Sequence, residues 1–162
     1  MRRKVVIIVA SVAVCLPLAG LLCGQMDLLA GMPPADLGVR NGMLKPPGAD
    51  AQNVVSSQAA MHPHRPGHVI APLRITGDPD AAFAKLETIV RGMDGASIVV
   101  SEPHYLRAEF RSKWLRFVDD AEFYLDTVAG VIHMRSASRL GRRDFGVNRA
   151  RLEAVRAAFD AT

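Results

Sequence analysis

Hydrophobic and polar residues alternate strictly over residues 104–111, with His104, Leu106, Ala108 and Phe110 on one side and polar or charged residues on the other. A period of two residues is typical of a strand with one buried face. Short apolar or alternating runs of the same kind occur elsewhere in the C-terminal part of the chain. We expect strands at residues 69–75, 97–101, 104–111, 116–126 and 131–138.

Two other segments have apolar residues at the spacing of an amphipathic helix. The first is predicted to begin with Asp78 as N-cap and Pro79 in the first turn, and to end at Gly92 or Gly95. The second is predicted to be capped by Asn148. Its apolar stripe consists of Leu152, Val155, Ala158 and Phe159.

The predicted order is one strand, one helix, four strands and one helix. Consecutive strands with short links pair antiparallel, and two amphipathic helices can cover one face of such a sheet. The pattern therefore predicts an α+β fold with an antiparallel sheet of about four to five strands and two helices on one face. Pro72 cannot donate a hydrogen bond to a neighbouring strand, so the first strand is expected at an edge.

The first 23 residues form a separate unit. Arg2, Arg3 and Lys4 precede an uncharged, apolar run at residues 5–22. This run is at the lower limit for a helix that crosses a bilayer, and the basic cluster is expected to stay cytoplasmic. We expect a membrane anchor in a bacterial inner membrane, with the domain on the periplasmic side. A cleaved signal peptide, or lipidation at Cys23, would give a secreted or lipid-anchored periplasmic protein instead.

Residues 24–67 are rich in glycine, proline and aspartate and have no sustained period, so they are predicted to be a tether with irregular structure. The folded domain is expected at residues 68–162. The only cysteines, Cys15 and Cys23, lie outside this domain, which excludes a disulfide or a zinc site built on thiolates within it.

The formal charge of the chain is +4, but three basic residues lie at the N-terminus. The remainder has 17 basic and 16 acidic residues, which does not favour a nucleic-acid partner. Seven arginines lie between Arg135 and Arg156, so a lipid headgroup or an anionic polymer of the cell envelope is a better candidate partner.

The candidate site lies on the central strands. Asp119 shares the parity of the apolar residues Phe117, Ala121 and Phe123, so its carboxylate needs a partner on the core side. We expect that partner from the adjacent strand. The pattern is interpreted either as a polar pocket for an anionic or polar ligand or as a structural network of ion pairs. The candidate ligand-binding residues are Arg107, Glu109, Asp119, Asp120, Glu122, Arg135, Ser136, Ser138, Arg139, Asn148 and Arg149.

Other chemistry has weaker support. His62, His64 and His68 have a spacing that can bind a metal, but they lie in a proline-rich segment that does not predict a rigid site. The chain has no Gly-x-Ser-x-Gly or His-Glu-x-x-His motif, so we assign no catalytic residue and no cofactor.

Several stretches resemble the family called domain of unknown function 1499. The resemblance includes Asp144-Phe145-Gly146-Val147-Asn148-Arg149 and extends from about residue 42 to residue 159. Its other parts are residues 53–58, 68–72, 105–112, 117–123 and 135–141. The resemblance implies a domain without an assigned activity.

We therefore expect a non-catalytic, membrane-anchored binding module for a lipid, a small amphiphile or an envelope protein. One alternative is an enzyme that uses Asp119, Asp120 or Glu122 as a general base, with Arg135 to bind an anion. Another is a structural or assembly partner of other envelope proteins.

Overall fold

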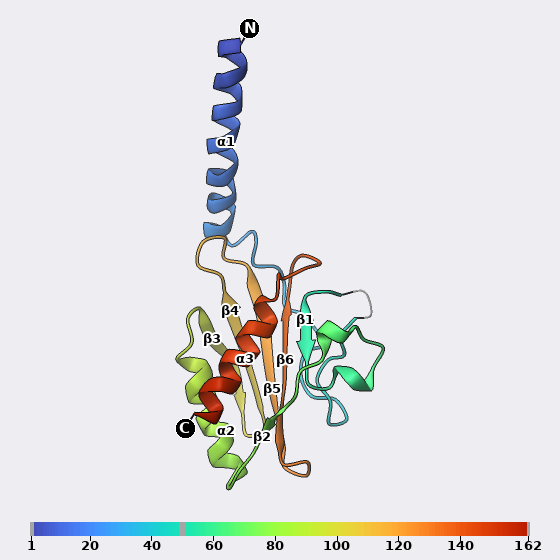
Figure 1. Ribbon diagram of the computed structural model, residues 1–162. Coiled ribbons are helices and arrows are strands. Elements are labelled where there is room, and N and C mark those ends of the chain that lie inside the picture. The colour runs from blue at the N-terminus through green and yellow to red at the C-terminus, as the bar shows by residue number, and fades with distance from the viewer. Residues whose placement is uncertain (1, 49–50, 162) are drawn as a thin grey trace.

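A computed structural model describes residues 2–48 and 51–161, with only the backbone for residues 2–12 and 14. The helices are α1 (Arg2–Gln25), α2 (Pro79–Arg91) and α3 (Val147–Asp160), with short 3-10 turns at Ala59–Met61 and Pro66–His68. The strands are β1 (Val54–Ser56), β2 (Leu73–Arg74), β3 (Ala96–Glu102), β4 (Tyr105–Arg111), β5 (Val118–Asp126) and β6 (Val131–Ser138). These elements confirm the predicted α+β class (Figure 1).

Within the described residues, the strands form one antiparallel sheet of six, rather than the four to five expected. Its order is β1-β6-β5-β4-β3, and β2 also pairs with β6. The strand predicted at residues 69–75 is reduced to Leu73–Arg74. The carbonyl groups of Ala71 and Pro72 instead accept hydrogen bonds from Arg156 of α3, so this backbone is held by a side chain rather than by a neighbouring strand.

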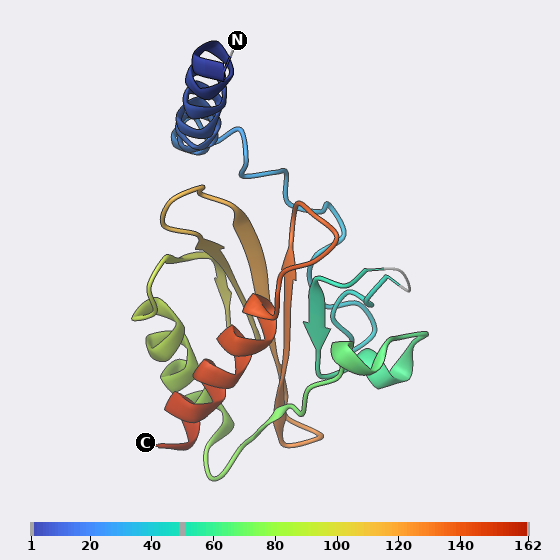
Figure 2. The ribbon, with the colours of Figure 1, turned by 45° about the horizontal axis from the view of Figure 1, so that its top comes forward.

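Helices α2 and α3 pack on one face of the sheet (Figure 2). The core between them contains Leu86, Val90, Leu152 and Val155 from the helices and, among others, Phe123 from the sheet. Burying one such side chain stabilises the fold by about 1.5–3 kcal/mol.

The predicted cap of α2 is confirmed, because the Asp78 carboxylate accepts from the backbone N–H groups of Asp80 and Ala81. The predicted cap of α3 is wrong. Gly146 occupies the N-cap position with a φ of 84°, and Asn148 lies inside the first turn with a fully buried side chain.

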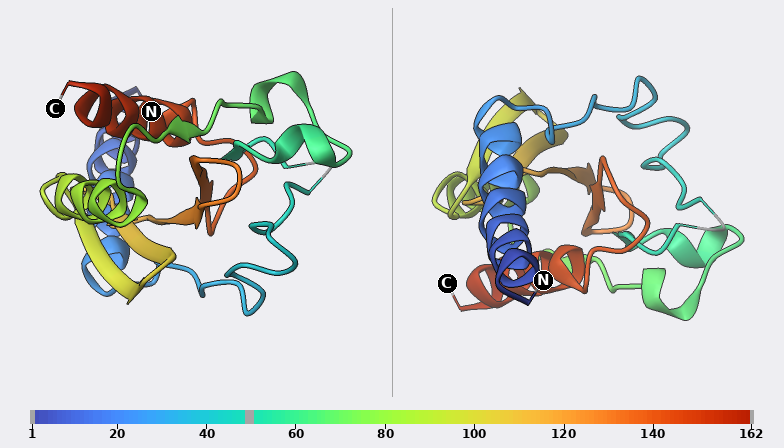
Figure 3. Two further views of the ribbon diagram at one scale, coloured as in Figure 1. Left: turned by 90° about the horizontal axis from the view of Figure 1, so that it is seen from below. Right: turned by 90° about the horizontal axis from the view of Figure 1, so that it is seen from above.

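Residues 32–48, which we call the N-terminal segment, lie beside the sheet away from the helix layer, as the two end views in Figure 3 show. Residues 54–56, predicted as part of a tether, form β1 and pair with β6. Leu44 is also buried, and its backbone N–H donates to the Gln58 side chain at 2.8 Å. The later part of the segment 24–67 is therefore part of the folded domain, because its apolar residues are buried and its backbone is hydrogen-bonded.

Helix α1 projects from the end of the sheet at which β4 connects to β5 (Figure 1). Its last turn contacts this connection: a Cβ added to Gly24 would lie 2.6 Å from the Leu115 carbonyl oxygen. Among the residues described in full, no helix is long and apolar enough to cross a membrane. Residues 5–12 and 14 of the predicted span lie outside the described side chains, so the span stays a prediction from sequence.

Candidate functional site

The candidate residues of the central strands are divided between the two faces of the sheet. In β5, Asp119 points to the helix layer, whereas Asp120 and Glu122 point to the opposite face, because side chains alternate along a strand. The polar residues on the face opposite the helices form what we call the covered network: Tyr105, Arg107, Glu109, Asp120, Glu122, Arg135 and Arg139. The polar residues on the face toward the helices form what we call the helix-side network: Asp119, Ser136, Ser138, Asn148 and Arg151.

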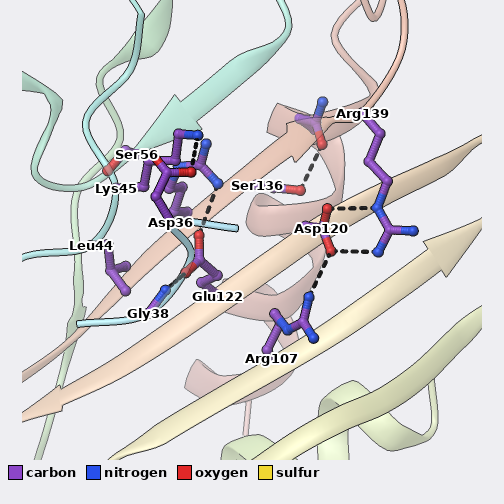
Figure 4. A network of polar contacts seen from close by, with 12 residues as sticks. Asp36, Gly38, Leu44, Lys45, Ser56, Arg107, Asp120, Glu122, Ser136 and Arg139 are labelled. Carbon is purple, nitrogen blue, oxygen red and sulfur yellow. Dashed lines mark hydrogen bonds and ion pairs between the residues drawn. The ribbon is translucent and has the colours of Figure 1, made fainter. Parts of the chain in front are cut away.

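Glu122 is the most deeply buried acid of the covered network, with no exposed surface. Its Oε2 accepts from Arg135 Nη1 at 2.8 Å, and its Oε1 accepts from the Tyr105 hydroxyl at 2.9 Å and from the Gly38 backbone N–H at 2.8 Å. Burial, followed by the negative charge of Glu122, raises the pKa of Tyr105. The Glu122 carboxylate is therefore satisfied from β4, β6 and the N-terminal segment together. Figure 4 shows the contact with Gly38.

Asp120 forms the second centre of the covered network. Its two oxygens accept from Arg139 Nε and Nη2, each at 2.8 Å, and Arg107 Nη1 lies 3.5 Å from Oδ1 (Figure 4). Arg139 also donates to Glu109. The hydrogen bond to Asp120 raises the pKa of Arg139, which keeps the guanidinium charged.

These contacts do not favour a general base in the covered network. A general base needs a carboxylate within reach of a substrate proton. Asp120 and Glu122 are buried, and each already accepts hydrogen bonds from a guanidinium group.

The helix-side network joins β5 and β6 to the first turns of α3. Asp119 Oδ2 accepts from Arg151 Nη2 at 2.6 Å. The buried Asn148 Oδ1 accepts from Arg151 Nη1 at 2.7 Å and from the Ser136 hydroxyl at 2.6 Å, while Asn148 Nδ2 donates to Ser138 Oγ at 3.0 Å. Asp119 therefore has a partner on the core side, as expected, but this partner comes from α3 and not from the adjacent strand.

A cavity of about 710 Å³ opens beside the helix-side network. It lies between the β4–β5 connection, the loop from Ser138 to Val147 and the first turns of α3. Its apolar wall includes Phe110, Phe117, Val118, Leu140, Phe145 and Val147. Its volume is in the range of sites for small molecules, roughly 300–1,000 Å³.

Charged groups lie at defined places in this cavity. Asp119 and Arg151 line it as an ion pair, and the Arg151 guanidinium lies 4.5 Å from the centre of the Phe110 ring. Arg111 and Arg143 also contribute to the lining. Asp94 and Asp144 line it as well, so the cavity combines an apolar wall with charged groups of both signs. This combination suits a molecule with an apolar body and a polar end.

The remaining predicted residues lie elsewhere. Arg149 donates to the carbonyl oxygens of Gly67 and Val69, so it fastens the segment before β2 to α3. His64 and His62 interact through a ring nitrogen and a backbone carbonyl, and buried His68 is hydrogen-bonded to the backbone of Ala51 and Arg65. Within the described residues, no three histidine, cysteine or acidic side chains are grouped as metal ligands.

Sequence reasoning did not select Arg151 or Tyr105 as site residues. Arg151 lies three residues after Asn148, which places both side chains on one side of α3. Tyr105 has the same parity in β4 as Arg107 and Glu109, so the alternation alone predicts that its side chain lies on their face of the sheet. The pairing of Arg151 with Asp119 had no local signal, because it depends on how α3 crosses the sheet.

Comparison with known proteins gives one family. The family model described as protein of unknown function (DUF1499) matches residues 44–159. No curated protein and no solved structure matches the chain. The family match covers most of the chain and confirms the resemblance found in the sequence, so the chain belongs to the DUF1499 family. The matched range includes Leu44 and β1 as well as the cavity, but not α1.

Proposed function

We propose that this member of the DUF1499 family is a non-catalytic binding module, and that the 710 Å³ cavity binds a lipid or another small amphiphile. The observation that carries this proposal is the combination of an apolar wall with the Asp119–Arg151 ion pair and other charged side chains in one cavity. Apolar surface supplies affinity without direction, and the charged groups orient the polar end of the ligand.

A polar headgroup that can accept hydrogen bonds from Arg143 is the preferred polar end. Arg143 is exposed and lines the cavity, whereas Arg111 is half-buried and is already paired with Asp27. Asp119 is already paired with Arg151, so its charge is balanced within the site. A phosphate or carboxylate can accept from guanidinium groups through two parallel hydrogen bonds.

The proposal includes attachment to a membrane through α1. The basic residues Arg2, Arg3 and Lys4 followed by the apolar run support an anchor whose domain lies on the periplasmic side of a bacterial inner membrane. In this arrangement the domain takes its ligand from the bilayer or from the envelope, and no nucleic acid is involved.

The test is native mass spectrometry of the full chain, extracted in mild detergent, with two matched variants. Ala150→Trp adds a large side chain to the cavity wall, whereas Ala154→Trp adds the same group to an exposed position of α3 one turn later that does not line the cavity. We expect a lipid-sized adduct that is lost on denaturation, retained in Ala154→Trp and lost in Ala150→Trp. The adduct mass distinguishes a phospholipid from a free fatty acid.

A chain without an adduct, or an equal adduct in both variants, contradicts the proposal, because in the second case the lipid binds outside the cavity. Circular dichroism of both variants checks that the fold is retained. Both variants place a tryptophan on α3, but only the one at residue 150 adds its side chain to the cavity lining.

A further inference from the structure

Large apolar side chains are exposed on two neighbouring loops at one end of the domain. The β4–β5 connection carries Trp114, which is 67% exposed, and the loop after β6 carries Phe145, which is 96% exposed. Both loops contribute residues to the wall of the cavity. Leu115, Phe117, Leu140 and Val147 are also exposed on or beside these loops. A cluster of this kind marks an interaction surface rather than ordinary surface variation.

These loops lie at the end of the domain from which α1 projects (Figures 1 and 2). Gly24 in the last turn of α1 lies against the Leu115 backbone, and Asp27 forms ion pairs with Arg111 and Arg116 at 2.7 and 3.1 Å. A Cβ added to Gly31 would contact the Leu140 side chain. The last turn of α1 is therefore held against the β4–β5 connection, and the chain directly after α1 is held against the loop that follows β6.

The loops are also basic. Residues 112–117 and 139–147 contain five arginines and lysines and a single acid, Asp144. Of the five, the Arg139 side chain is buried and paired with Asp120, and Arg116 is paired with Asp27. Lys113, Arg142 and Arg143 are exposed, and the Lys113 ammonium lies 5.4 Å from the centre of the Trp114 ring. Aromatic tips surrounded by lysine and arginine fit the interface of an anionic bilayer, where the rings enter the headgroup region and the cations meet phosphate.

We infer that this end of the domain is a second membrane contact, which seats the Trp114 and Phe145 loops in the headgroup region of an anionic bilayer. The inference rests on the proposed attachment through α1, because a spanning α1 would bring its last turn, and with it Leu115, to the membrane surface. The mouth of the cavity then faces the lipid, and a ligand can enter it without crossing water.

The single tryptophan of the chain makes this surface measurable. The full chain is reconstituted into vesicles of phosphatidylcholine with phosphatidylglycerol, and Trp114 emission is recorded with iodide in the water or with brominated lipids in the bilayer. We expect a blue-shifted emission, protection from iodide and quenching by lipids brominated near the headgroup. Raising the phosphatidylglycerol content should strengthen all three effects.

A matched pair of variants assigns the effect to this surface. Phe145→Asp places a negative charge on it, and Val128→Asp makes the same kind of change at a 98% exposed residue in the β5–β6 turn at the other end of the domain (Figure 1). Phe145→Asp should lose the blue shift and the lipid quenching, while Val128→Asp should retain both.

The outcomes separate this inference from the proposed function. A chain that floats with the vesicles but leaves Trp114 open to iodide overturns the second contact and leaves the attachment by α1 intact. The same holds if Phe145→Asp behaves as the unmodified chain. A chain that does not float overturns both. Loss of the lipid adduct in mass spectrometry, with Trp114 still quenched by lipid, overturns only the proposed cavity ligand.

Discussion

Asp119 and Asp120 are neighbours in β5, yet their carboxylates are held by different arginines on opposite faces of the sheet. Asp119 pairs with Arg151 of α3 at 2.6 Å, and Asp120 pairs with Arg139, which follows β6, at 2.8 Å. Two adjacent acids therefore belong to two separate networks. One network lines the cavity, and the other lies beneath the N-terminal segment.

The first prediction concerns Glu122, the fully buried acid of the covered network. Glu122→Gln keeps the shape of the side chain but leaves the Arg135 guanidinium buried without a compensating charge. Removing one partner of such a pair typically costs about 3–5 kcal/mol. We expect a decrease of this size in the free energy of unfolding, measured by urea denaturation of the full chain in detergent and followed by circular dichroism.

Glu153→Gln is the control for that measurement. Glu153 forms ion pairs with Arg149 and Arg156 but is 48% exposed, and exposed pairs contribute about 0–1 kcal/mol. Equal losses in the two variants would mean that the Glu122 pair contributes no more than a surface pair.

The second prediction concerns Asn148 and Ser136, whose side chains share a 2.6 Å hydrogen bond in the helix-side network. Asn148→Ala also removes the hydrogen bonds to Ser138 Oγ and to the Asn53 carbonyl, which keeps the Ser138 backbone N–H as a donor. This variant should therefore lose more stability than Ser136→Ala. Removing one partner of a buried hydrogen bond costs about 1–3 kcal/mol. In a double-mutant cycle, the double variant should be more stable than the sum of the single losses indicates, whereas additive losses would show that the two side chains are not coupled.

The third prediction concerns pH. Burial lowers the pKa of His133 below its ordinary value of 6.5, and the nearby Asp126 carboxylate opposes this shift. The unfolded chain therefore binds a proton on this ring more readily than the folded chain. The stabilisation is complete above about pH 6.5 and is lost as the pH falls through the pKa of the folded state.

Thermal unfolding at pH 7.5 and pH 5.5 measures this effect. His133→Gln removes the titrating ring, so its midpoint should fall less between the two values than that of the unmodified chain. His104→Gln changes an exposed histidine in the β3–β4 turn and should behave as the unmodified chain. A pH dependence that is the same with and without His133 would refute the assignment.

The fourth prediction compares two glycines with positive φ. Gly95 has a φ of 73°, and a Cβ there would lie 2.5 Å from the Arg111 carbonyl oxygen. Gly130 has a φ of 66°, but a Cβ there would meet nothing within 4 Å. Both alanine variants carry the backbone strain of about 1 kcal/mol, and Gly95→Ala also has to displace the end of β4. We expect Gly95→Ala to unfold at clearly lower urea concentration than Gly130→Ala, and equal midpoints would contradict this.

Local patterns predicted the elements from β3 onward well. The alternation in β4 placed Leu106, Ala108 and Phe110 on the buried face, and all three are buried. Asp78 caps its helix because its side chain reaches backbone groups only two and three residues away. Such signals depend on neighbours in the chain, so they are readable without the fold.

The later part of the segment 24–67 was harder to predict for the opposite reason. Its glycines and prolines suppress any period, yet β1 joins the sheet and the Gly38 N–H reaches Glu122, 84 residues later. Short strands at a sheet edge take their stability from the partner strand, and the sequence of the short strand alone does not reveal the partner.

The sequence by itself determined the α+β class, the faces of the central strands and the need of Asp119 for a partner on the core side, because periodicity and the cost of a buried charge act locally. Only the tertiary structure decided that this partner is Arg151, that Arg135 and Arg139 serve the other face, and that a cavity opens beside α3. These outcomes depend on where α3 and the N-terminal segment cross the sheet, and that position follows from packing between residues far apart in the chain.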